Sequence, residues 1–116
     1  LITPENSFLA MIYSETGDAY NLKKDPLKAT EFIYKAYQTD TLNRVRIFKL
    51  AYHYDYEMDD RKYALEYYKK YLAMAPDSKR NAESIGISYK DFALKRINDI
   101  KKNISIANKK KSIKPK

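Results

Sequence analysis

The chain has no cysteine and no tryptophan, and its 116 residues include one histidine and two glycines. Without cysteine it cannot form disulfides, thiolate nucleophiles or cysteine-ligated zinc sites. The only histidine, His53, is expected to pack or to lie on the surface rather than to act as a base. Two separated glycines cannot build a phosphate-binding loop. We therefore predict that the protein is not an enzyme, and we expect no catalytic residues, no metal and no cofactor.

The acidic cluster at residues 55–60 lacks the ligand spacing and the central glycine of a calcium-binding loop. We interpret it as a solvated turn in which Asp60 caps the following helix. Apolar runs are also short, because none approaches the roughly 20 residues that a membrane-spanning helix needs. The sequence does not indicate a cellular compartment.

The net charge of +8 lies almost entirely at the C-terminal end. Seven lysines and no acidic residue follow Asp99, so residues 1–100 carry 16 basic and 15 acidic side chains. A domain that binds nucleic acid through its fold carries basic charge on that fold, so nucleic acid is the less favoured partner. Residues 106–116 are rich in lysine and poor in apolar side chains, and we predict a disordered tail there.

A small residue followed three positions later by tyrosine recurs at intervals of 34 and then 35 residues. The three pairs are Gly17 with Tyr20, Ala51 with Tyr54, and Gly86 with Tyr89. Self-similarity at this period is typical of stacked helical hairpins, which present an extended surface rather than a closed pocket. The sequence therefore predicts an all-α fold of about five helices, and it favours binding over catalysis.

Capping residues and prolines mark the ends of the expected helices. The helices should span about residues 4–22, 26–39, 44–56, 61–75 and 79–103. Thr3, Asp25 and Asp60 are the predicted N-caps, and Pro76 prevents the fourth helix from continuing. The fifth helix should be the longest, and its buried stripe includes Ala93, Ile97 and Ile100.

The repeated positions resemble the tetratricopeptide repeat, a 34-residue helix–turn–helix with small, aromatic and proline residues at fixed places. The first unit matches at Tyr13, Thr16-Gly17, Tyr20, Ala29, Ile33 and Ala36. The second matches at Ile47, Leu50-Ala51, Tyr54, Ala64, Tyr68, Tyr71 and Pro76, and the third at Ala82, Ile85-Gly86 and Tyr89. The resemblance implies a right-handed superhelical stack of antiparallel helix hairpins. It divides residues 1–105 into repeats at about 10–43 and 44–78 and a half-repeat or capping helix at about 79–104.

In tetratricopeptide arrays the first helix of each unit lines a concave face, and the resemblance implies a candidate binding surface there. Its apolar centre would comprise Val45, Phe48, Tyr52, Tyr56 and Ile87, and its polar margins Asp18, Asn21, Arg80 and Lys90. We predict that this face binds a peptide or a partner helix through hydrophobic anchors. The alternative is that its apolar residues pack on one another or on an upstream unit.

The lysine-rich end is the basis of an alternative function, an accessory protein that contacts nucleic acid or an anionic surface electrostatically. Two and a half repeats are also fewer than the roughly three that a solenoid needs for stability. We therefore expect a fragment of a longer repeat protein, or self-association through the open N-terminal edge of the stack.

Overall fold

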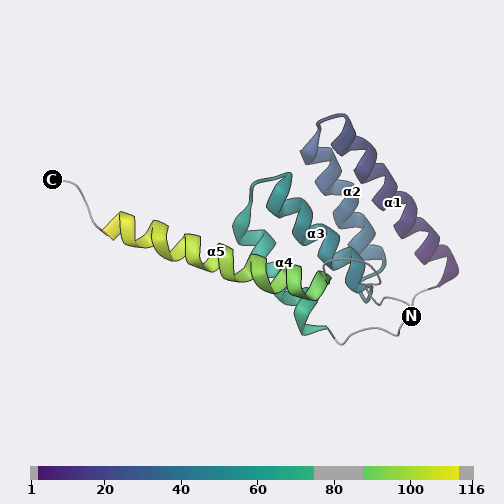
Figure 1. Cartoon of the computed structure of the whole chain (residues 1–116). Coiled ribbons are helices and arrows are strands. Elements are labelled where there is room, and N and C mark those ends of the chain that lie inside the picture. Colours follow the sequence, from purple (N-terminus) through teal and green to yellow (C-terminus); the bar gives the residue numbers. More distant parts are fainter. Residues whose placement is uncertain (1–2, 75–87, 113–116) are drawn as a thin grey trace.

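A computed structural model describes residues 3–74 and 88–112 of the chain, with side chains as far as residue 106. These residues form five α-helices and no strand, which confirms the predicted all-α class. The first four helices pair as two antiparallel hairpins, and the fifth lies against the second hairpin and extends away from it (Figure 1). The helices are α1 (Pro4–Leu22), α2 (Pro26–Thr39), α3 (Arg44–Tyr56), α4 (Arg61–Ala73) and α5 (Tyr89–Ser112).

Side chains that cap the first helical turns fix where α1 to α4 begin. The side-chain oxygens of Thr3, Asp25 and Asp60 each accept a hydrogen bond from the backbone amide three residues later, at 3.1, 3.2 and 3.1 Å. These three N-caps confirm the predicted starts of α1, α2 and α4. Asn43 caps α3 through the amide of Val45 at 2.9 Å. Pro76, the predicted stop after α4, lies outside the described residues.

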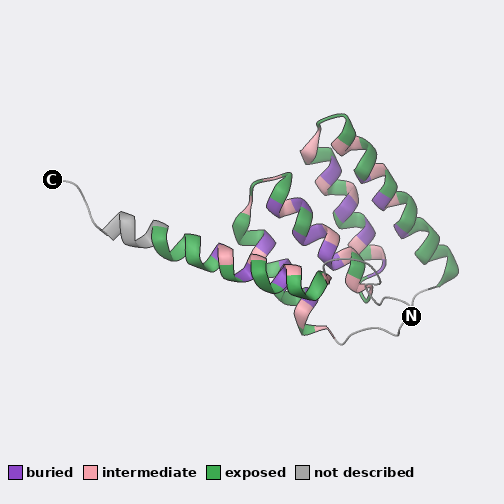
Figure 2. Cartoon of the chain, viewed as in Figure 1, coloured by how far each residue is buried: buried purple, intermediate pink, exposed green. Residues whose placement is uncertain are grey.

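The hydrophobic core lies within and between the two hairpins and under the first half of α5 (Figure 2). Its fully buried side chains include Ile33 of α2, Leu50 of α3, and Tyr68 and Tyr71 of α4. Within the first hairpin, a Cβ added to Gly17 would lie 2.6 Å from Ile33 Cγ1. The backbones of α1 and α2 therefore approach too closely for a side chain at this position. Its counterpart in the third unit, Gly86, lies outside the described residues.

The prediction for the fifth helix is correct in its buried stripe and wrong at both ends. Ala93, Ile97 and Ile100 are buried, as expected. The helix begins at Tyr89 rather than near residue 79, because the Ser88 hydroxyl accepts hydrogen bonds from the next turn and caps it. The other residues of the predicted N-terminal part, 79–87, are not among those described.

The helix also continues to Ser112, so the predicted disorder from residue 106 is wrong for residues 106–112. Lysine and alanine have high helix propensity even where nothing apolar is buried. Cationic side chains in the last turns of a helix also interact favourably with its dipole. The lysine-rich composition therefore extends α5 instead of ending it.

The polar contact between α3 and α5 is offset from the one between α1 and α3. Between the first and second hairpins, Asn21 of α1 faces His53 of α3. One repeat interval leads from Asn21 to Asp55, which is 34 residues later, and from His53 to Ser88, which is 35 residues later. If the same contact were repeated, Ser88 would therefore face Asp55. The observed partner of Asp55 is Arg96, eight residues further along the chain. This offset corresponds to about two helical turns.

Candidate interaction surface

The outward side of α3 carries an apolar and aromatic line that is partly uncovered. Val45, Tyr52 and Tyr56 share one face of the helix and are 40, 44 and 50% exposed. Tyr89, in the first turn of α5, is 41% exposed and stacks on Phe48 of α3, with ring centroids 4.6 Å apart. We define the aromatic surface as Val45, Tyr52, Tyr56 and Tyr89.

Phe48 is a core residue rather than the exposed anchor that the sequence predicted. Its side chain is 9% exposed, because α5 and α4 cover it. Phe92 and Tyr71 meet its ring edge-on, with centroids 5.7 and 5.3 Å away. Tyr52 and Tyr89 rest on this buried ring. Rings held in place before binding lose less conformational freedom when a partner docks.

The margin of the surface toward α1 is polar and its charge is balanced. Asp18, predicted at this margin, is exposed and pairs with Lys49 of α3 at 2.8 Å. Lys49 was not among the predicted surface residues, although it lies between Val45 and Tyr52 in sequence on the same side of α3. Its Nζ also donates to Ser14 Oγ at 2.6 Å. Lys49 therefore ties α1 to α3 at the edge of the aromatic line.

Asn21, predicted at the same margin, belongs to the contact between the hairpins. Its Nδ2 lies 3.4 Å from Nδ1 of the buried His53, while His53 Nε2 lies 2.7 Å from Thr30 Oγ1. Because the Thr30 hydroxyl donates to the Pro26 carbonyl oxygen, it accepts from His53 Nε2–H. His53 Nδ1 is then the acceptor for the Asn21 amide.

Burial lowers the pKa of His53 from its ordinary value of 6.5, so the ring is neutral at pH 7. The neutral form agrees with the hydrogen bonds, since one ring nitrogen donates and the other accepts. Asn21 Oδ1 is buried and has no hydrogen-bond partner within the described part of the chain. The expectation that His53 packs is confirmed by its burial.

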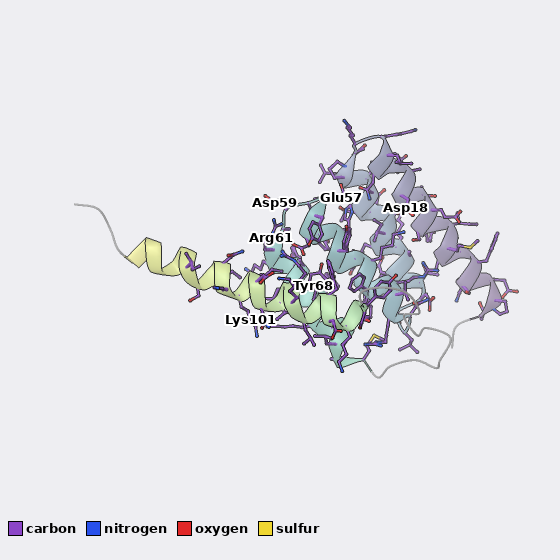
Figure 3. The ribbon with its side chains drawn as sticks, viewed as in Figure 1. Asp18, Glu57, Asp59, Arg61, Tyr68 and Lys101 are labelled. Atoms are coloured by element: carbon purple, nitrogen blue, oxygen red, sulfur yellow. The ribbon has the colours of Figure 1, made fainter. Side chains whose placement is uncertain are left out.

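Asp55 forms a buried ion pair with Arg96 where α5 crosses the second hairpin. Arg96 Nε and Nη2 donate to its two carboxylate oxygens at 2.7 and 2.9 Å. The Tyr68 hydroxyl donates at 3.0 Å, and burial together with the Asp55 charge raises the pKa of Tyr68. Arg61, labelled with Tyr68 in Figure 3, contributes Nε at 3.4 Å. The prediction that Asp55 belongs to a solvated turn is therefore wrong.

The remaining predicted surface residues lie at the start of α5 or beyond the description. Lys90 is exposed beside Tyr89. Arg80 and Ile87 lie outside the described residues. Within the described ranges, no group of three or more histidine, cysteine, aspartate or glutamate side chains is arranged to hold a metal ion.

The sequence matches no protein-family model, and searches of curated proteins and of solved structures returned no match. No described helix is both long enough and apolar enough to cross a lipid bilayer.

Proposed function

We propose that the chain is a non-catalytic protein-interaction module of the tetratricopeptide type, which binds a peptide or a partner helix through the aromatic surface. The observation that carries this proposal is the exposure of Tyr52, Tyr56 and Tyr89 above a packed aromatic base. Tyrosine offers a large contact area with few rotatable bonds and is enriched among residues that dominate binding energy. A line of rings along a helix matches a partner segment that carries apolar side chains at regular spacing.

The two hairpins support the repeat architecture in this proposal. Gly17 of the first unit lies against Ala29 and Ile33 of its partner helix. The corresponding residues of the second unit, Ala51 and Ala64, are both fully buried. Small residues that let paired helices approach closely are what the repeat signature requires. In this proposal α5 is the capping helix that closes the stack.

The proposal can be tested by selecting peptides from a random displayed library on the immobilised 116-residue chain. The dissociation constant of a selected peptide is then measured by calorimetry for the wild type and for the double variant Tyr52→Ser/Tyr56→Ser. Loss of two aromatic contacts near the centre of an interface costs about 2 kcal/mol or more, so we expect binding to weaken at least about 30-fold.

Tyr63→Ser is the matched control, because Tyr63 lies on α4 and is 50% exposed, like Tyr56. We expect its peptide affinity to equal that of the wild type, and circular dichroism should show the same helicity for all three proteins. Selected peptides that bind the double variant as tightly as the wild type would reject the aromatic surface as the binding site.

The charge of α5 favours a second candidate, an accessory protein for nucleic acid or anionic surfaces. The helix contains eight basic and two acidic residues. This function requires an oligonucleotide affinity that falls steeply with salt and that is lost when Lys101, Lys102 and the lysines at 109–111 become glutamine. The absence of any binding at low salt would reject it.

A further inference from the structure

The outward face of α1 carries an apolar stripe bounded by acidic residues. Phe8 and Ile12 are 60 and 40% exposed. Glu5 lies three residues before Phe8, and Glu15 lies three residues after Ile12. All four residues therefore share one face of the helix. The residues that α1 buries lie on the opposite face and are Ala10, Ser14 and Gly17. Since α1 is the outermost helix of the first hairpin, none of the other described helices covers the stripe (Figure 1).

The apolar stripe of α5 leaves the core in the far half of the helix and becomes exposed beside a basic residue. Ala93, Ile97 and Ile100 are buried in the core. Ile104 continues their spacing of four, three and four residues. The far half of α5 extends beyond the second hairpin (Figure 1). Ile104 is accordingly 40% exposed. Lys101, three residues earlier, is exposed beside it.

The two helices have opposite charge and lie at opposite sides of the molecule. Helix α1 contains three acidic and no basic residues, whereas α5 contains eight basic and two acidic residues. Figure 3 shows Asp18 of α1 and Lys101 of α5 on opposite sides of the helical body. The two stripes cannot meet within one chain while Arg96 holds α5 on the second hairpin. Complementary patches at opposite ends of one molecule fit successive copies of that molecule.

We propose that the far end of α5 of one copy docks on the outward face of α1 of the next copy. Ile104 packs against Phe8 and Ile12, and Lys101 faces the acidic margin formed by Glu5 and Glu15. The contact joins two different patches, so it generates chains or rings rather than a two-fold dimer. It leaves the aromatic surface uncovered, and its failure would leave the proposed function untouched.

Sedimentation velocity of the 116-residue chain, over a range of concentrations and at low and high salt, tests this contact. We expect the weight-average mass of the wild type to rise with concentration and to fall as salt screens the charges. The α1 variant Phe8→Ser/Ile12→Ser and the α5 variant Lys101→Glu/Ile104→Ser should each remain monomeric. Because each variant keeps one intact patch, an equimolar mixture of the two should form a one-to-one heterodimer and nothing larger.

The mixture separates this contact from any symmetric one. A two-fold contact between α1 faces would persist in the α5 variant, and that result would overturn the proposal. A wild type that stays monomeric at its highest soluble concentration in low salt would overturn it as well. All the substituted residues are exposed, and circular dichroism should show that each variant keeps its helicity. The control Lys69→Glu, on an exposed position of α4, should associate like the wild type.

Discussion

The Arg96→Met variant should weaken the attachment of α5 to the second hairpin while leaving the first hairpin intact. Arg96 holds the fully buried Asp55 carboxylate through two short hydrogen bonds, at 2.7 and 2.9 Å. The hydrogen bonds to Asp55 raise the pKa of Arg96, so the guanidinium stays charged. Methionine retains much of the apolar stem of arginine but supplies no charge. The variant therefore leaves Asp55 as a buried carboxylate without its main partner.

Removing one partner of a buried ion pair costs about 3–5 kcal/mol. Asp55 keeps the Tyr68 hydroxyl at 3.0 Å and Arg61 Nε at 3.4 Å, so we expect a value near the lower end, about 3 kcal/mol. That is a large part of the roughly 5–15 kcal/mol that stabilises a small domain. In the double variant Asp55→Asn/Arg96→Met no charge is left unpaired at the site, and more than half of the lost stability should return.

Hydrogen exchange followed residue by residue is the assay that locates the effect. A loss of about 3 kcal/mol lowers the protection of the buried α5 amides, near Ala93 and Ile100, by about 100-fold. Amides of α1 and α2 should change much less, because α5 packs against the second hairpin. The matched control is Lys95→Met, which removes an exposed pair with Asp99 and should cost at most about 0.5 kcal/mol. Equal exchange in the two variants would refute the reasoning.

Two further predictions concern the first hairpin and its contact with the second. Gly17→Ala should lower the free energy of unfolding, measured in urea, by about 1–3 kcal/mol, because the new Cβ would meet Ile33 Cγ1. The control Lys69→Ala should have little effect. A Gly17 variant as stable as the wild type would contradict the close approach of the two helices. Because the pKa of His53 is lowered in the folded protein, the unfolded chain binds more protons than the folded chain just below pH 6.5. The free energy of unfolding should therefore fall as the pH decreases through this range, by up to about 1.4 kcal/mol per pH unit. In His53→Gln this part of the slope should disappear, and an unchanged slope in urea titrations would assign it to another group.

The helix starts could be predicted because capping is local. Thr3, Asp25 and Asp60 each act on an amide three residues away, so a short stretch of sequence contains the whole interaction. The start of α5 escaped prediction because the apolar pattern runs without interruption through Ser88, which hides the cap. Its end escaped because composition alone does not distinguish a solvated helix from a disordered tail.

The surface was predicted less well, because which aromatic residue is covered depends on distant helices. Phe48 and Tyr52 are both aromatic residues near the outward side of α3, and only the position of α5 decides that Phe48 is buried. Likewise, Asp55 lies in an acidic run that resembles any solvated turn. Its partner is 41 residues away, and the repeat interval points to Ser88 instead of Arg96.

The Asp55–Arg96 pair offers a physical reason why α5 takes a position two turns away from the one that the repeat predicts. An apolar stripe spaced by three and four residues can slide along a hairpin by one turn and still bury similar side chains, so hydrophobic contact alone specifies the position weakly. Any such slide removes Arg96 from Asp55 and leaves a buried carboxylate without its main partner, at a cost of several kcal/mol. Only the observed position places Tyr89 over Phe48. The ion pair therefore favours the position of α5 that brings Tyr89 into the aromatic surface, and Arg96→Met should weaken peptide binding although Arg96 is not part of that surface.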